Sequence, residues 1–192
     1  MEKKGAGRPR DGNPEETRRE ILRAAEESFA RSGFVGATTR LVAASAGVNV
    51  ATLHYHFGSK EGLYRAVLRR ASEEALPEVP AGGSPAEEVA RLVAALYDAG
   101  LRRPSFARLA LLDSLAGPPA GPAALDPRVP WLAGRLRDCL NGSAAAAPPA
   151  EQAARTILTL LDATVATASP ASSEEPARNA VVAAALRITG LA

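Results

Sequence analysis

The segment from Thr38 to Gly62, TTRLVAASAGVNVATLHYHFGSKEG, constrains the fold of this chain more than any other. Its pattern predicts two short helices joined by a tight turn, followed by the start of a third helix. Gly47 supplies the positive φ that a sharp turn requires. Ala43 is small enough for the second helix to cross closely over the first, and Val48 and Leu53 are spaced to hold the second helix against a core. This spacing is that of a DNA-binding helix-turn-helix.

The residues around this motif strengthen the prediction. Phe57 has the character of a buried residue, and Ser59 is a good N-cap for the long helix that follows Gly58. Lys60 falls in the first turn of that helix, where a cation opposes the helix dipole. Helix stability therefore does not explain Lys60, whereas a nearby phosphate does. Asn49 is placed to cap the second helix of the motif, whose exposed residues are then free to face a DNA groove.

Residues 17–67, roughly the first third of the chain, resemble the DNA-binding domain of the TetR family of transcriptional regulators. Four motifs carry the resemblance: REILRAAEESFARSGF in the first helix, the helix start at Thr38 and Thr39, AGVNVATLHYHF, and GSKEGLYRAV. The family implies an all-α homodimer with an N-terminal three-helix helix-turn-helix domain and a helical C-terminal domain for ligand binding and dimerisation. It also implies a palindromic operator and a fourth helix that links the two domains.

The resemblance and the chemistry of the side chains assign ten residues to double-stranded DNA. Thr39 lies at a helix N-terminus, where a hydroxyl group binds phosphate well. Tyr55 and Lys60 are also expected to hold phosphates. The residues at the start of the recognition helix are best placed for base edges. His54 stands where the family more often has tyrosine and Val50 where it often has lysine, which leaves the base preference open. The ten predicted DNA contacts are Thr39, Arg40, Asn49, Val50, Ala51, Thr52, His54, Tyr55, His56 and Lys60.

Charge is divided unevenly along the chain. Residues 1–72 carry a net charge of +5 and residues 73–192 a net charge of −3, although the whole chain carries only +2. A basic N-terminal part followed by an acidic C-terminal part indicates that only the N-terminal part contacts nucleic acid. Aromatic residues make up 4% of the chain, and the abundance of alanine, leucine and valine favours helices over sheets.

No residue pattern indicates catalysis, a cofactor, a metal or a membrane span. His54 and His56 are the only histidines, and side chains two residues apart on a helix point too far apart to share a metal ion. Serines and aspartates are scattered without a paired base, so nothing supports an enzyme. Without a signal sequence or an apolar run near ~20 residues, the protein is expected to be cytoplasmic. The single cysteine, Cys139, excludes an intramolecular disulfide.

We expect an all-α chain of about nine helices in three regions. Residues 1–12 form a flexible basic arm, residues 13–76 the helix-turn-helix domain, and residues 77–192 the C-terminal effector-binding and dimerisation domain. The turn-rich segment PEVPAGGSP at 77–85 marks the boundary between the two domains.

The first helix is expected to begin after a cap at Asn13 and to end at Gly33, with Phe34 folding back as an apolar contact. The last two helices, 150–168 and 174–191, carry apolar residues around much of their circumference. The resemblance implies that they pair with a second copy as a four-helix bundle, which would set two recognition helices about 34–36 Å apart. A tightly packed monomeric core is the alternative. The other expected helices are 39–45, 50–56, 60–75, 86–101, 105–115 and 129–140.

TetR-like proteins generally bind a small molecule among the C-terminal helices and then release DNA, and the scarcity of charge here favours a largely apolar effector. Trp131, the only tryptophan, follows a predicted loop and is the best single candidate. An ordinary place in the core is the competing interpretation for each candidate, and the domain could lack an effector altogether. The candidate ligand contacts are Tyr97, Phe106, Leu109, Leu112, Asp113, Trp131, Leu136 and Asp162.

Two other classes of protein stay open. One is a structural or non-specific DNA-binding protein without a small-molecule effector, which would bind random and palindromic DNA with similar affinity. The other is an enzyme or a transport-associated binding module whose DNA-binding head is a relic. Repression is favoured over activation only by the habit of the family.

Overall fold

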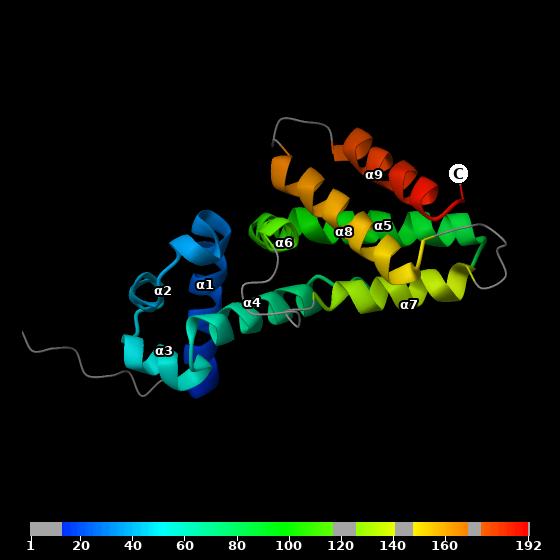
Figure 1. Cartoon of the computed structure of the whole chain (residues 1–192). Coiled ribbons are helices and arrows are strands. Elements are labelled where there is room, and N and C mark those ends of the chain that lie inside the picture. The colour runs from blue at the N-terminus through cyan, green and yellow to red at the C-terminus, as the bar shows by residue number, and fades with distance from the viewer. Residues whose placement is uncertain (1–12, 117–125, 141–147, 169–173, 192) are drawn as a thin grey trace, which may run out of the picture.

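The computed structural model describes residues 13–116, 126–140, 148–168 and 174–191. Within these ranges the chain forms nine helices and no strand, which confirms the predicted all-α class. Figure 1 shows α1–α4 gathered at one end of an elongated molecule and α5–α9 bundled at the other. The helices are α1 (Pro14–Gly36), α2 (Thr39–Ser45), α3 (Val50–Phe57), α4 (Lys60–Glu74), α5 (Pro85–Arg102), α6 (Pro104–Ala116), α7 (Arg128–Leu140), α8 (Ala150–Thr167) and α9 (Glu174–Ile188).

Polar side chains cap the start of each of the first four helices. Asn13 Oδ1 accepts a hydrogen bond from the N–H of Glu15 at 3.1 Å, and Thr38 Oγ1 accepts one from the N–H of Leu41 at 3.2 Å. Asn49 and Ser59 act in the same way at α3 and α4. Because the first N–H groups of a helix have no partner within the helix, these caps fix where each helix begins.

The first helix ends in two steps. Gly33 adopts a φ of 66°, which interrupts α1, but helical turns resume and continue to Gly36. The regular helix therefore ends at Gly33 as predicted, and one short further turn carries α1 to Gly36. The bend does fold Phe34 back as predicted, with its ring 6.2 Å from that of Phe29.

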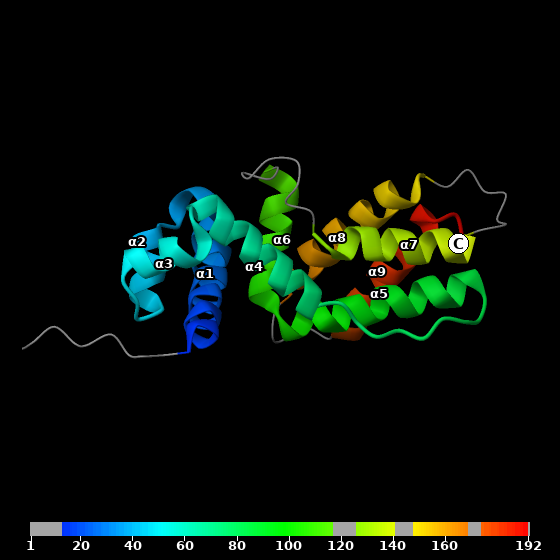
Figure 2. The ribbon, with the colours of Figure 1, turned by 90° about the horizontal axis from the view of Figure 1, so that it is seen from below.

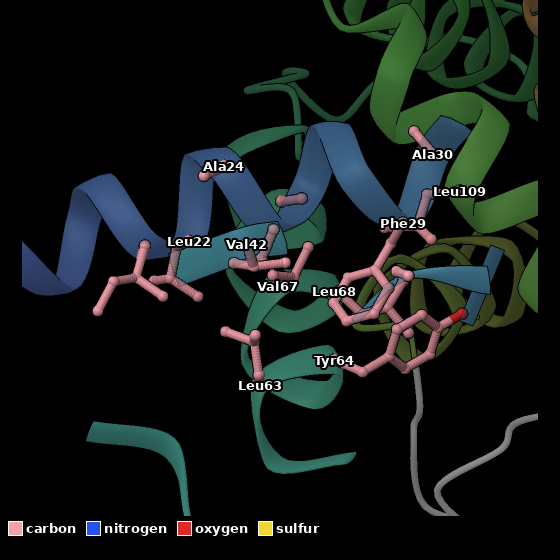
Figure 3. Packing of buried hydrophobic residues seen from close by; sticks show 14 of the residues in the cluster. Leu22, Ala24, Phe29, Ala30, Val42, Leu63, Tyr64, Val67, Leu68 and Leu109 are labelled. Carbon is pink, nitrogen blue, oxygen red and sulfur yellow. The ribbon is translucent and has the colours of Figure 1, made fainter. Parts of the chain in front are cut away.

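An aromatic cluster lies at the centre of the N-terminal core. Tyr64 of α4 meets Phe29 of α1 edge to face, with ring centroids 5.0 Å apart, and meets Phe34 at 5.2 Å. Figure 3 shows Phe29 and Tyr64 close together, with Leu109 of α6 reaching in beside Ala30. Edge-to-face rings add to the stability that burial supplies, so α1 and α4 form a firm base for the short helices α2 and α3.

The C-terminal helices enclose a second apolar cluster. Helix α8 packs against α6 and α7, and α9 packs against α5 and α8. Their buried residues recur three or four positions apart, which places them on one face of each helix. Figure 2 shows α6 standing between this bundle and α1–α4. The fully buried leucine and isoleucine residues of the cluster include Leu92, Leu132, Leu136, Ile157 and Leu161.

Helix α6 belongs to both parts of the molecule. Phe106 and Leu109 are buried in the N-terminal cluster, whereas Ala107 is buried in the C-terminal cluster. Just before α6, Arg103 bonds to Glu26 of α1 at 2.8 Å and to Glu74 of α4 at 2.7 Å. The two parts are therefore joined by apolar packing and by ion pairs.

The predicted helix bounds agree with the observed ones to within two residues elsewhere, except at the end of α9. There Gly190 has a φ of 73° and the N–H of Leu191 donates to the carbonyl of Leu186. This is a glycine-dependent helix stop, so α9 ends at Ile188 and not at the predicted 191. The predicted boundary at 77–85 falls between α4 and α5, and the predicted arm at 1–12 lies outside the described residues.

Candidate nucleic-acid interface

The turn between α2 and α3 is held by backbone hydrogen bonds. Gly47 has a φ of 67°, and the N–H of Val48 donates to the carbonyl of Ala43 at 2.9 Å. Ala43 is only 1% exposed, so a larger side chain has no room there. The structure thus confirms the roles predicted for Ala43 and Gly47 in bringing the two helices together.

Helix α3 is fixed at its start and along its inner face. Asn49 Oδ1 accepts hydrogen bonds from the N–H of Thr52 at 2.7 Å and from Thr52 Oγ1 at 3.0 Å. Leu53 is completely buried, and Val50 is half-buried and packs against the N-terminal core. These contacts set which side of α3 faces away from the protein.

The outward face of α3 carries Ala51, His54 and Tyr55, all exposed. Residues three and four positions apart share one face of a helix. The side chain of Tyr55 is 86% exposed, and an aromatic ring left in water contributes little to folding. Its phenol is a hydrogen-bond donor suited to a phosphate oxygen. This face therefore has the chemistry of a surface that meets DNA.

His54 and His56 have different surroundings. His54 Nδ1 lies 2.8 Å from the carbonyl oxygen of Gly58. His56 is half-buried, with its ring 5.3 Å from that of Tyr55 and 6.1 Å from that of Phe57. Of the two histidines, His54 is the one that presents its ring to solvent.

The corner between α3 and α4 is tightly built. Gly58 has a φ of 71°, and Ser59 Oγ accepts from the N–H of Gly62 at 3.1 Å. A Cβ atom on Gly62 would overlap the carbonyl oxygen of Phe57. The glycine at position 62 therefore allows α4 to start directly beside the end of α3.

Lys60 has partners within the protein that sequence reasoning missed. Its Nζ donates to the carbonyl of Val35 at 3.3 Å and lies 4.5 Å from the centre of the Phe34 ring. The inference that only a phosphate explains Lys60 is thus too narrow, because the side chain ties α4 to the end of α1. An ammonium group has three N–H donors, so donors remain for DNA. In the sequence, the aromatic residue Phe34 directly after Gly33 was the signal that could have pointed to a partner for Lys60.

The remaining predicted contacts lie on the same end of the molecule, on α2, α3 and the first residue of α4 (Figure 1). Arg40 and Asn49 are exposed, whereas Thr39 is half-buried at the start of α2. Leu41, which was not predicted, is 60% exposed beside Arg40. A large apolar residue left in water next to this arginine is a further candidate for contact with the DNA backbone or a thymine methyl group.

The candidate ligand contacts are distributed among different surroundings. Phe106 and Leu109 pack in the N-terminal core, whereas Tyr97 and Leu136 are buried in the C-terminal core. Leu112 lies on α6 and is 36% exposed. The structure therefore gives these five residues packing or surface positions that need no ligand.

Asp113 pairs with the N-terminal part of the molecule. Its Oδ1 accepts a hydrogen bond from the hydroxyl of Tyr64 at 2.9 Å. Burial raises the pKa of the Asp113 carboxyl, and the hydrogen bond from Tyr64 opposes the rise. This contact joins α6 to α4 and explains Asp113 without a ligand.

Asp162 holds a buried arginine. Its two carboxylate oxygens accept from the guanidinium of Arg128 at 2.9 and 2.7 Å, and Arg128 also donates to Asp126 at 2.8 Å. Asp162 and Arg128 are 1% and 2% exposed. Burial raises the pKa of Asp162, although the charge of Arg128 opposes the rise. The guanidinium lies 4.5 Å from the centre of the Phe106 ring, so this ion pair sits against α6.

Trp131 lines an open hollow of about 490 Å³. Arg135, also in the lining, is held by Glu88 at 2.6 Å and by the carbonyl of Val79 at 2.9 Å. The hollow thus lies beside the segment that follows α4. Among the eight candidate ligand contacts, Trp131 is the one that this hollow includes. Its lining residues are Pro77, Glu78, Val79, Pro80, Trp131 and Arg135.

The described titratable groups form neither a metal site nor a reactive thiol. In the part of the chain that the structure describes, no three histidine, cysteine, aspartate or glutamate side chains cluster as metal ligands would. Burial, together with a hydrogen bond to Glu88, raises the pKa of the Cys139 thiol to about 11, so the less reactive thiol form prevails at neutral pH. Among the described helices, none has the length and apolarity to cross a membrane.

Comparison with known proteins identifies the N-terminal part. The family described as "Bacterial regulatory proteins, tetR family" matches residues 21–67. The HTH-type transcriptional regulator UidR of Escherichia coli K12 is 40% identical over 60 residues, 31% of each chain. The HTH-type transcriptional repressor AcnR of Corynebacterium glutamicum is 36% identical over 77 residues, 36% of this chain and 41% of AcnR. The alignments thus span less than half the length of these relatives.

The similarity of fold extends further along the chain. The crystal structure of a TetR-like transcriptional regulator from Rhodococcus sp. RHA1 superposes with a TM-score of 0.69 over 89% of this chain and 94% of the other, at 19% identity. The matched helix-turn-helix segment and the shared fold agree with each other. Residues 21–67 thus match the helix-turn-helix region of the TetR family, and the chain as a whole shares the fold of a TetR-like regulator.

Proposed function

We propose that this protein is a ligand-responsive repressor that binds a palindromic operator as a homodimer. The observation that carries the proposal is the outward face of α3, where His54 and Tyr55 project from a helix whose inner face is fixed by Leu53. The net charge of +5 on residues 1–72 suits a phosphate backbone. Repression is proposed by analogy with AcnR, which is named a repressor.

In the proposed complex α3 lies in the major groove with its first turn toward the base edges. The Tyr55 hydroxyl, the remaining donors of Lys60 and the start of α2 at Thr39 hold phosphates. The exposed Arg40 is long enough to reach a guanine. Because the amide oxygen of Asn49 is used in the cap, its NH₂ group is the part that is left for a base.

The outer face of α8 supports the proposed dimer. Thr156, Thr164 and Thr167 donate their hydroxyl hydrogens to carbonyls of their own helix at 3.0, 2.7 and 2.8 Å. Their methyl groups are then the part left to contact another surface. Leu160 among them is 41% exposed. A second copy can cover this face without leaving those hydroxyls unpaired, which keeps the cost of burial low.

The hollow at Trp131 supports the proposed response to a ligand. The hollow has a volume of about 490 Å³ and is open to solvent, and its indole, valine and prolines suit the apolar part of a ligand, with Glu78 and Arg135 at hand for a polar group. Because Val79 and Pro80 follow α4, a ligand there would act next to the helix that leads to the DNA-binding end. The ligand must bind the conformation that does not bind DNA more tightly, or it shifts nothing.

Selection of bound sequences from random duplex DNA tests the proposal. We expect an inverted repeat whose half-sites are about one helical turn apart, together with a dimer by light scattering. If random DNA is bound as tightly as the selected site, a structural DNA-binding protein is favoured instead. If the protein shows catalysis and does not shift DNA in a gel, an enzyme or a binding module whose DNA-binding domain is a relic is favoured. Since Trp131 is the only tryptophan, its fluorescence reports directly on compounds that enter the hollow.

A pair of matched variants tests the dimer. Leu160→Arg places a charge on the proposed interface and is expected to give monomers that bind DNA weakly. Leu115→Arg is the control, because Leu115 lies on α6 and is 72% exposed. A Leu160→Arg protein that remains a dimer would show that the interface lies elsewhere.

A further inference from the structure

One contact of His54 fixes how its ring can bond to another molecule. The carbonyl oxygen of Gly58, 2.8 Å from His54 Nδ1, can only accept a hydrogen bond, so Nδ1 carries a proton and donates. In the neutral imidazole the second nitrogen, Nε2, then carries a lone pair and accepts. The ring therefore has a defined polarity, with its donor used inside the protein.

The position of His54 makes this acceptor available to DNA. His54 is exposed on the outward face of α3, while Leu53 is completely buried on the inner side. The bond to Gly58 holds the Nδ1 side of the ring against the end of α3, which leaves Nε2 on the side away from that anchor. Ala51, one turn earlier on the same face, carries only a methyl group and leaves room for a base edge.

We infer that His54 recognises the exocyclic amino group of an adenine or a cytosine through Nε2. Phosphate oxygens carry no hydrogen, so they cannot donate to the lone pair of Nε2. In the major groove the donors on base edges are the N6 amino group of adenine and the N4 amino group of cytosine. The inference rests on the proposed function and deepens it, because it assigns a base preference to one residue.

The test begins with sequences selected from random duplex DNA by the wild-type protein and by His54→Ala. We expect wild type to prefer one base pair at one position of each half-site, with the adenine or cytosine of that pair as the selected base, and His54→Ala to lose the preference at that position alone. The selected base is then replaced by an analogue that lacks its exocyclic amino group. Wild type should lose affinity by about 2- to 10-fold, the range of one hydrogen bond, whereas His54→Ala should lose nothing further.

His56→Ala is the matched control, since it removes the same chemical group from the same helix. Whatever it does to total affinity, it should leave the preference at the His54 position intact. Circular dichroism of each variant confirms that the helices are present before binding is compared.

The outcomes separate this inference from the proposed function. An unchanged wild-type affinity for the analogue that lacks the amino group would overturn the inference while leaving the operator intact. So would a uniform loss of affinity with a smaller salt dependence, because that pattern marks a protonated His54 on a phosphate. If wild type selects no sequence at all, the proposed function fails and the inference fails with it.

Discussion

The DNA-binding end and the C-terminal bundle are held together by different kinds of contact. Each of α1–α4 starts at a polar cap within two or three residues of the N–H that it binds. In α5–α9 two ion pairs join distant residues, because the buried Arg128 and Asp162 are 34 positions apart and the half-buried Arg135 and Glu88 are 47 apart. Within the bundle, α5 has a capping box at Ser84, whereas α8 begins at Pro149 without a side-chain cap.

This difference shows where each part is vulnerable. A cap is worth about 1 kcal/mol and its loss leaves an N–H group that water can reach. Loss of one member of a buried ion pair leaves a charge that water cannot reach, at a cost of about 3–5 kcal/mol. Local caps thus contribute several small terms at the DNA-binding end, whereas the buried pair of Arg128 and Asp162 contributes one large term in the bundle.

The largest effect is expected for Arg128→Ala. The variant leaves the buried Asp162 without its cation, so the carboxyl must take up a proton or stay charged in the core, and the free energy of unfolding should fall by about 3–5 kcal/mol in urea titrations followed by circular dichroism. Arg137→Ala, on the exposed side of the same helix, should change it by less than about 0.5 kcal/mol. Equal effects of the two variants would show that the buried pair does not hold the bundle.

Arg103→Ala tests the junction between the two parts. Arg103 and Glu26 are 21% and 17% exposed, so we expect a smaller loss of about 2–3 kcal/mol. Trp131 fluorescence and circular dichroism should then report separate unfolding transitions. Arg69→Ala is the control, because its pair with Glu73 is largely exposed and is worth under about 0.5 kcal/mol.

The Arg103→Ala variant should also lose a different amount of stability at different pH values. Burial raises the pKa of Glu26, and the charge of Arg103 opposes that rise. Without Arg103 the pKa of Glu26 rises further, so the folded variant holds a proton that the unfolded chain releases. Its stability falls as pH increases, and the deficit relative to wild type should be larger at about pH 8 than at about pH 5. A deficit that is larger at the lower pH would contradict this account.

Two glycines give effects of opposite sign in the two parts. Gly62→Ala brings a Cβ against the Phe57 carbonyl, and overpacking of this kind costs about 1–3 kcal/mol. Gly134, within α7, has no atom within 4 Å of an added Cβ, so Gly134→Ala should raise the free energy of unfolding by about 0.5–1 kcal/mol. Thermal unfolding measures both, and only Gly62→Ala should also weaken DNA binding.

The smallest expected loss of stability is that of a cap. Asn49→Ala removes the bonds to Thr52 and should lower the free energy of unfolding by about 1 kcal/mol. Asn179→Ala, exposed on α9, should not lower it. A loss from Asn49→Ala as large as that from Arg128→Ala would remove the contrast between the two parts.

Sequence alone predicted much of the DNA-binding end because its signals are local. The caps at Asn13 and Asn49 and the turn at Gly47 are encoded within a few residues of the structure that they specify. The partners of Lys60 were missed, since Val35 and Phe34 lie 25 or more positions away.

The C-terminal part shows the limit of the same reasoning. Its helices were predicted from apolar spacing, but Asp162 was proposed as a ligand contact when its partner is Arg128. No pattern along the chain links residues 34 positions apart. Packing decides such pairs, so the buried polar contacts of a bundle become visible only in three dimensions.

The dual membership of α6 has a consequence for anyone who shortens this protein. Cutting the chain after residue 76 would keep the four helices α1–α4 but strip Phe106 and Leu109 from their core. The fragment would expose an apolar patch where α6 had packed and would tend to aggregate. A soluble shortened protein would need α6 joined to it again, or polar residues in place of Phe29 and Ala30, which would otherwise be exposed to water.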